Sequence, residues 1–112
     1  MAEVADIELD ALRVAADAAC ALMKSLANPD RLMLLCELVQ GERNVGELEQ
    51  ALGLAQPSLS QQLAVLRDAR LVDTRRAGKH IYYRITSTQA VGVLRALHQQ
   101  FCEPVAAARS GA

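Results

Sequence analysis

The stretch that decides the fold is NVGELEQALGLAQPSLSQQLAVLRDARLVDTRRAGKHIYYRI, residues 44–85. Asn44 is a typical helix-capping residue, and Gly53 suits the left-handed turn that follows a helix, so VGELEQAL is predicted to form a short helix. Gln56 and Pro57 are expected to open a second helix, because proline is favoured in the first helical turn. The stretch therefore begins with two helices joined by a short turn.

The second of these helices has one apolar face and one polar face. Residues about 100° apart around a helix place on one side Leu59, Leu63 and Leu66. The opposite side carries Ser58, Gln61, Gln62 and Val65. Serine and glutamine have hydrogen-bonding ends that can contact base edges or phosphates, and they lack the charges of an ordinary solvated face. An ordinary polar surface is the alternative that this helix alone leaves open.

A basic β-hairpin is predicted directly after the helix. Apolar and polar residues alternate on both sides of the Ala77-Gly78-Lys79 turn, a pattern typical of paired strands. Residues 57–86 carry six Lys or Arg against two Asp, whereas residues 1–56 carry four Lys or Arg against ten acidic residues. The net charge of −1 therefore hides a local basic patch that can attract a phosphate backbone.

The whole chain is short and rich in aliphatic residues. Its 112 residues suffice for one domain, residues 1–112, and a composition of 52% hydrophobic but 3% aromatic residues favours packed helices. Helical spacing predicts a first helix capped by Asp6 and a second from Pro29 to about Val39. A last helix is expected from about Thr88 to Val105, where Pro104 and the small residues that follow it are predicted to end the helix. We therefore expect a mainly α fold with a two-stranded β-hairpin.

Composition and motifs argue against several functions. No apolar run approaches the ~20 residues that span a bilayer, and the acidic N-terminus lacks a secretory signal, so a cytoplasmic protein is expected. The cysteines Cys20, Cys36 and Cys102 do not form a disulfide framework and are expected to be thiols. There is no CxxC, no glycine-rich phosphate loop and no triad pattern around His80 or His98, so neither an enzyme nor a cofactor is predicted.

The order of these elements is that of a winged helix-turn-helix, whose second helix enters the major groove while the hairpin contacts the flanking backbone. Nearly the whole chain resembles the ArsR/SmtB family of bacterial repressors, including the wing sequence RRAGKHIYYR. The resemblance implies a homodimer, joined by its first and last helices, that binds an inverted repeat of double-stranded DNA. The predicted DNA contacts are Gln56, Ser58, Ser60, Gln61, Gln62, Arg67, Arg75, Arg76, Lys79 and His80.

The metal sites known in this family are not repeated in the sequence. The Cys-x-Cys pattern of arsenic, cadmium and lead sensors would fall in VGELEQAL, which has no thiol. The ligands of zinc sensors would fall on the last helix, where the chain offers Thr86, Ser87 and Thr88 and a solitary His98. No metal ligand is therefore predicted.

A pair of cysteines is the remaining candidate for a sensing site. Cys36 lies in the apolar segment RLMLLCELVQG, where a cysteine can simply fill space. However, RLMLLCELVQGERNVGELEQ, QPSLSQQLAVLR and ALHQQFC resemble the BigR, SqrR and YgaV group of persulfide-responsive repressors. This resemblance implies that reactive sulfur species bridge Cys36 to Cys102 and thereby release DNA.

Cys20 and His98 are candidate accessory residues of that pair. His98 lies four residues before Cys102, hence on the same face of an α-helix, where it could stabilise the thiolate. Two alternatives stay open at this point. One is a metal-responsive repressor that uses the same thiols as ligands, and the other is a general thiol redox sensor.

Overall fold

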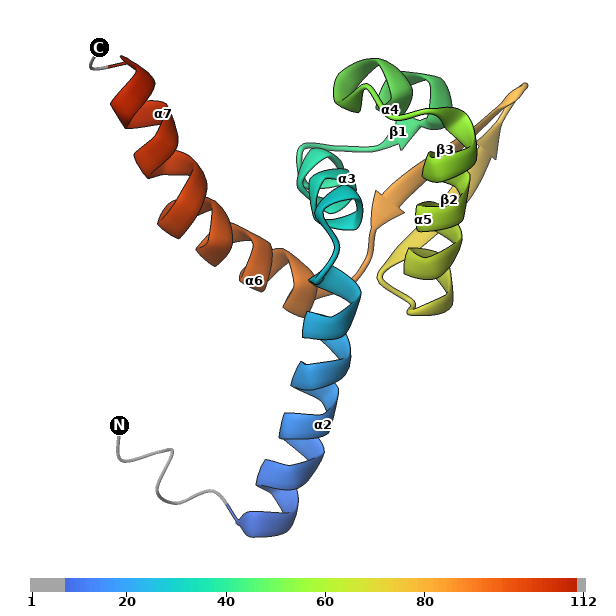
Figure 1. The fold of residues 1–112 in the computed structure, drawn as a ribbon. Coiled ribbons are helices and arrows are strands. Elements are labelled where there is room, and N and C mark those ends of the chain that lie inside the picture. The colour runs from blue at the N-terminus through green and yellow to red at the C-terminus, as the bar shows by residue number, and fades with distance from the viewer. Residues whose placement is uncertain (1–7, 111–112) are drawn as a thin grey trace.

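The computed structural model describes residues 8–110. The helices are α2 (Leu9–Leu26), α3 (Pro29–Val39), α4 (Val45–Leu52), α5 (Gln56–Asp68), α6 (Thr88–Leu97), the π-helical turn η1 (His98–Cys102) and α7 (Glu103–Ser110). The strands are β1 (Arg43–Asn44), β2 (Val72–Ala77) and β3 (His80–Ile85). Figure 1 shows a body formed by α3, α4, α5 and the sheet, from which α2 and the continuous α6-η1-α7 arm extend in different directions.

The helices begin and end at the capping residues that the sequence indicates. The side chain of Asn28 accepts a hydrogen bond from the backbone N–H of Arg31 at the start of α3. Asn44 and Glu47 form a reciprocal capping box at α4, since each side chain accepts from the backbone N–H of the other. Gly53 ends α4 with a φ of 68°, a left-handed value that suits glycine. The predicted bounds of α3 and α4 and the start of α5 are confirmed.

A cluster of leucines forms the core where α3, α4, α5 and α6 meet. Its fully buried members are Leu34, Leu35, Leu48, Leu59, Leu63, Leu66 and Leu94. The leucine face predicted for α5 is confirmed, because Leu59, Leu63 and Leu66 are at most 1% exposed. Burying this face turns the opposite side of α5 to solvent, which positions the candidate site.

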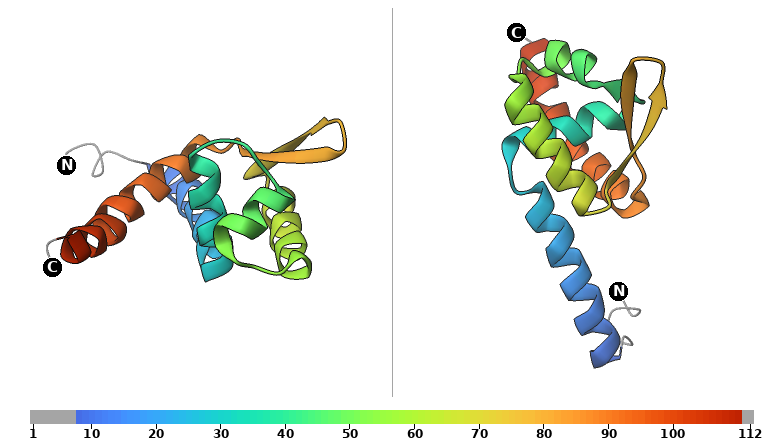
Figure 2. Two further views of the ribbon diagram at one scale, coloured as in Figure 1. Left: turned by 90° about the horizontal axis from the view of Figure 1, so that it is seen from above. Right: turned by 90° about the vertical axis from the view of Figure 1, so that its right-hand side faces the viewer.

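The sheet has three strands rather than the two that the sequence predicts. Its order is β1-β3-β2 with both pairings antiparallel, and Arg43 of β1 lies opposite Tyr83 of β3. The predicted β2–β3 hairpin is present, with Ala77 paired to His80 near its tip. Two residues are too few to show the alternation by which a strand is recognised, so β1 is defined only by its pairing. In the view from above, the hairpin and the C-terminal helix lie at opposite ends of the molecule (Figure 2).

The C-terminal helix continues past the stop predicted at Pro104, and that prediction is wrong. α7 runs through Pro104 to Ser110, directly after the π-helical turn η1. In η1 the backbone N–H of Glu103 donates to the carbonyl of His98, five residues back rather than four. A proline ring clashes with the carbonyl four residues earlier in a regular α-helix, and the wider π-helical turn gives this ring room.

Large apolar side chains are exposed on both arms. The exposed set, with fractions of 45–71%, is Leu9, Leu12, Val14 and Met23 on α2 and Phe101 and Val105 on the C-terminal arm. The radius of gyration of 16.5 Å exceeds the ~13 Å typical of a compact chain of this length.

The predicted cap at Asp6 lies outside the described residues. Within residues 8–110, no helix has the length and apolar character needed to cross a membrane.

Replacing Gly53 and Gly92 by alanine should change stability in opposite directions. An added Cβ meets no atom within 4 Å at either position, so only the backbone differs. Gly53→Ala is expected to lower the free energy of unfolding by about 1–2 kcal/mol, because the left-handed conformation is strained for residues with a Cβ. Gly92→Ala, inside α6, should raise it by about 0.5–1 kcal/mol. Urea unfolding followed by circular dichroism measures both, and changes of the same sign would contradict the backbone explanation.

Candidate functional site

The open face of α5 carries some of the side chains predicted to contact DNA from this helix. Ser58 and Gln61 are exposed there, and Gln56 is exposed in the first turn of the helix. Gln62 is instead half-buried at the edge of the face, where its Oε1 accepts a hydrogen bond of 3.0 Å from Nη1 of Arg31. Gln62 therefore lies at the edge of the polar face predicted from the sequence, with its side chain already hydrogen-bonded within the molecule.

A second strip of α5 faces the sheet. Ser60 and Arg67 are exposed and line a groove of about 560 Å³ together with Arg70 and Tyr83. Arg70 has a φ of 61°, the one positive value among the non-glycine residues that the structure describes. This conformation turns the chain from α5 toward β2 and places Arg70 in the lining of the groove. Arg70 was not among the DNA contacts predicted from the sequence.

The β2–β3 hairpin, the wing, presents basic side chains near its tip. All four wing side chains predicted to contact DNA are exposed: Arg75, Arg76, Lys79 and His80. Arg75 is already engaged, because its Nε lies 2.8 and 2.9 Å from the carboxylate oxygens of Glu42. Its guanidinium also lies 4.8 Å from the ring centroid of Tyr82. Arg75 therefore fastens the wing to the segment before β1, a role that the sequence analysis did not assign.

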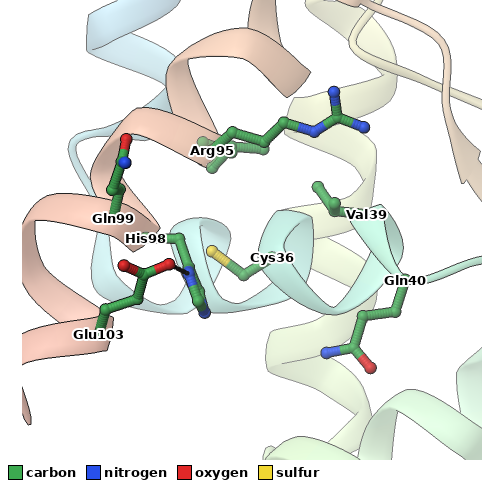
Figure 3. A pocket seen from close by; sticks show the side chains of 8 residues that line it. Cys36, Val39, Gln40, Arg95, His98, Gln99 and Glu103 are labelled. Carbon is green, nitrogen blue, oxygen red and sulfur yellow. Dashed lines mark ion pairs between the residues drawn. The ribbon is translucent and has the colours of Figure 1, made fainter. Parts of the chain in front are cut away.

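The thiol of Cys36 opens into a pocket of about 370 Å³ between α3 and the C-terminal arm. Figure 3 shows the sulfur of Cys36 directed toward His98, with Glu103 next to the imidazole ring. The Nδ1 atom of His98 lies 3.9 Å from Oε1 of Glu103. The other side chains that line the pocket are Val39, Gln40, Leu94, Arg95 and Gln99. Cys36 therefore packs against the core on one side and is open to the pocket on the other.

Cys36 and Cys102 are close enough to interact electrostatically. Burial raises the pKa of the half-buried Cys36 thiol, and the charge of Cys102 raises this pKa further. Cys102 is exposed on η1, whereas Cys36 lies on α3. Cys102 thus lies within electrostatic range of Cys36, although it is not among the side chains that line the Cys36 pocket.

The two candidate accessory residues have different surroundings. His98 lines the Cys36 pocket and belongs, with Cys102, to the π-helical turn η1, so its proposed effect on the Cys102 thiolate stays a prediction. Cys20 is exposed on α2 and is not among the residues that line the pocket. Among residues 8–110, no three His, Cys, Asp or Glu side chains are grouped closely enough to hold a metal ion.

The exposed polar helix, the helix that precedes it and the basic hairpin together define a winged helix-turn-helix regulator. The model of the bacterial regulatory proteins of the arsR family matches residues 28–74. The biofilm growth-associated repressor of Agrobacterium fabrum is 49% identical over 102 residues, which cover 91% of this chain and 87% of that protein. The regulator YgaV of Escherichia coli is 34% identical over 96 residues, covering 85% of this chain and 97% of that protein.

A solved structure agrees with these sequence relatives. The crystal structure of the transcriptional repressor BigR from Xylella fastidiosa matches with a TM-score of 0.80 at 47% identity, over 86% of this chain and 98% of that chain. The chain belongs to the ArsR family of bacterial regulatory proteins, in the same group as the BigR repressors and YgaV. The family resemblance and the winged-helix fold expected from the sequence are confirmed.

The pH dependence of Cys36 alkylation should report its neighbour Cys102. Because the pKa of Cys36 is raised, its thiolate fraction at neutral pH is small, and iodoacetamide should modify it only at more alkaline pH. Cys102→Ser removes the smaller of the two causes and should shift the Cys36 profile part of the way back toward lower pH. Cys20→Ser is the matched control and should leave the profile in place. Peptide mass spectrometry measures both, and an identical Cys36 profile in Cys102→Ser would contradict the electrostatic contact.

Proposed function

We propose that the protein is a cytoplasmic, homodimeric repressor that binds an inverted-repeat operator and is released when reactive sulfur species bridge Cys36 and Cys102. One observation carries this proposal. The half-buried thiol of Cys36 on α3 opens into a pocket, and the opposite side of that pocket is formed in part by η1, the turn that contains Cys102. The family supplies DNA binding, and two of the relatives named above, those from Agrobacterium fabrum and Xylella fastidiosa, are repressors. No enzymatic activity is proposed.

DNA binding is assigned to the open face of α5 and to the wing. The side chains proposed to contact bases or phosphates are Gln56, Ser58, Ser60, Gln61, Arg67, Arg76, Lys79 and His80, all of which are exposed. Gln61 projects from the face opposite the buried leucines, where a recognition helix contacts base edges. Lys79, at the tip of the wing, has the compact positive charge that suits a phosphate contact.

A second copy of the chain is the proposed cover for the two arms. α2 and the C-terminal arm expose large apolar side chains that a monomer would leave in water, among them Leu9, Met23 and Phe101. The radius of gyration of 16.5 Å reflects arms that extend from the body, as Figure 1 shows. Burying these arms in a two-fold interface would fix the separation of the two recognition helices.

The proposed chemistry is a sequence of sulfur-transfer steps with a persulfide, RSSH, as the oxidant. A protein thiolate attacks the sulfane sulfur of RSSH, keeps that sulfur atom and releases RSH. We assign the first attack to the exposed Cys102 and closure of the bridge to Cys36. A bridge with two added sulfur atoms consumes three RSSH and releases three RSH and one molecule of hydrogen sulfide, so that sulfur, hydrogen and electrons balance. A direct disulfide needs Cα atoms about 4.4–6.8 Å apart, whereas added sulfur atoms span farther.

Bridging would change DNA affinity because the two thiols belong to segments with different roles. Cys36 lies on α3, which packs in the core against α5, whereas Cys102 lies on the arm assigned to the dimer interface. A covalent link between them ties the position of the DNA-binding body to that arm. A coupling free energy of about 1–3 kcal/mol would lower operator affinity by roughly 5- to 150-fold.

Substitutions on α5 and on the wing should separate base reading from phosphate binding. Gln61→Ala should lower operator affinity by about 1–3 kcal/mol and relax the base preference at one position of each half-site. Lys79→Ala should weaken binding to all duplexes and lower the salt dependence by about one phosphate contact. The operator is first recovered by selection from random duplexes, and its footprint should cover two half-sites about one helical turn apart. Unchanged base preference in Gln61→Ala would refute its assigned role.

Removing either cysteine should abolish the response but leave DNA binding intact. Cys36→Ser and Cys102→Ser should bind the operator with the affinity of the reduced protein and keep that affinity after treatment with a persulfide donor. Cys20→Ser is the matched control and should still be released. Intact mass, measured on the same samples as operator affinity, should show two added sulfur atoms that are lost with either of the first two variants.

The same experiment separates the alternatives. A released protein that has lost two hydrogens without gaining sulfur would indicate a general thiol redox sensor. Release by a soft metal ion, with the metal retained in the native mass, would indicate the metal-responsive alternative. Full release with an unmodified Cys36 would refute the proposed bridge.

A further inference from the structure

Arg31 connects three helices through one guanidinium group. Its Nε donates to the carbonyl oxygen of Ser25 at 2.7 Å and its Nη2 to that of Lys24 at 3.3 Å. Its Nη1 donates to Oε1 of Gln62 at 3.0 Å. Arg31 lies in the first turn of α3, Lys24 and Ser25 in the last turn of α2, and Gln62 in the middle of α5.

The chemistry of each partner suits this position. The last carbonyls of a helix have no partner within the helix and carry partial negative charge, so a cation there satisfies and stabilises the end of α2. The planar guanidinium has five N–H groups in a fixed fork and can therefore reach α2 and α5 at once, which the single ammonium of a lysine cannot do. Because arginine only donates, the carbonyl end of Gln62 must face it.

We infer that the contacts of Arg31 with α2 and with Gln62 form a latch that sets the position of α5 relative to α2. Arg31 is in this sense a positioning residue for DNA binding, and Gln62 anchors the recognition helix instead of reading bases. The half-buried setting of Gln62 at the edge of the open face agrees with this role. Gln61, the neighbouring residue on that face, is exposed and keeps the reading role.

The latch also offers a route from the thiol to the recognition helix, a point that rests on the proposed function. Arg31 and Cys36 belong to the same eleven-residue helix, α3. A helix of this length moves as one rigid piece, so a bridge that displaces Cys36 also displaces Arg31. Gln62 and the end of α2 would then follow or lose their hydrogen bonds, and α5 would shift in either case.

A double-mutant cycle on operator affinity tests the latch. Arg31→Lys and Gln62→Leu should each weaken operator binding about 10-fold or more, the loss expected for a hydrogen bond to a charged group. The double variant should be no weaker than the weaker of the two single variants, because both remove the same contact. Gln62→Glu should bind within about 3-fold of the unchanged protein, since its carboxylate still accepts from Arg31. Losses that simply add, or a Gln62→Glu as weak as Gln62→Leu, would overturn the inference.

Base preference distinguishes an anchor from a reader. Selection from random duplexes with Gln62→Leu should return the same operator as the unchanged protein, whereas Gln61→Ala should lose preference at one position. A changed preference at a single position in Gln62→Leu would overturn the assignment of Gln62. Thermal unfolding accompanies each variant. If Arg31→Lys does not fold, the comparison of Gln62→Glu with Gln62→Leu still decides the outcome.

The sulfur response gives a separate readout. Persulfide-treated Gln62→Leu should gain the same mass as the unchanged protein yet show a smaller fold-change in operator affinity. An equal fold-change would overturn the role of the latch in the response. If the unchanged protein gains no bridge, the proposed function fails, while the affinity cycle and the selection still test the latch.

Discussion

The packing of leucine side chains between α3 and α5 is the constraint on which the rest of the structure depends. Leu34 and Leu35 of α3 and Leu59, Leu63 and Leu66 of α5 are almost completely buried in one cluster. Three buried positions on a single side of α5 leave that helix one rotational setting, because any other would expose leucine and bury polar groups. The polar face that a recognition helix needs is therefore a consequence of the core.

The arginines next to this face and on the wing differ in how they are held. Arg31 and Arg75 are both held by acceptors within the molecule, Gln62 and Glu42 respectively, and so stabilise the framework. The exposed wing residue Lys79 has a different environment, beyond the sheet. The cations near this surface therefore differ in their surroundings, and Lys79 is of the kind proposed to meet a phosphate backbone directly.

The π-helical turn connects the two halves of the proposed function. By adding one residue to a turn, η1 admits Pro104 without ending the helix, and it changes the direction of the side chains that follow α6. Cys102 belongs to this turn and lies within electrostatic range of Cys36. The same turn brings His98 and Glu103 together beside the pocket. Local backbone irregularity of this kind is common at functional sites.

The sequence by itself determined the elements whose signals are local. The cap at Asn44, the left-handed glycine at Gly53 and the leucine spacing of α5 each depend on residues within a few positions, and the structure confirms them. The family resemblance, carried by contiguous motifs, pointed to Cys36 and Cys102 in the same way. The two helix-terminus signals and the leucine spacing could be predicted because the interactions that produce them act within one helix or one turn, whereas the cysteine pair rests on the resemblance and stays a proposal.

The features that join distant segments became visible only in three dimensions. β1 exists because Arg43 meets Tyr83, and Gln62 is an anchor because Arg31 reaches it across 31 positions of sequence. The π-helical turn overrode the helix stop expected at Pro104, since the spacing rules that apply to a regular α-helix do not hold there. Such contacts depend on how helices pack in three dimensions, and no local pattern in the sequence specifies which side chains that packing brings within hydrogen-bonding distance.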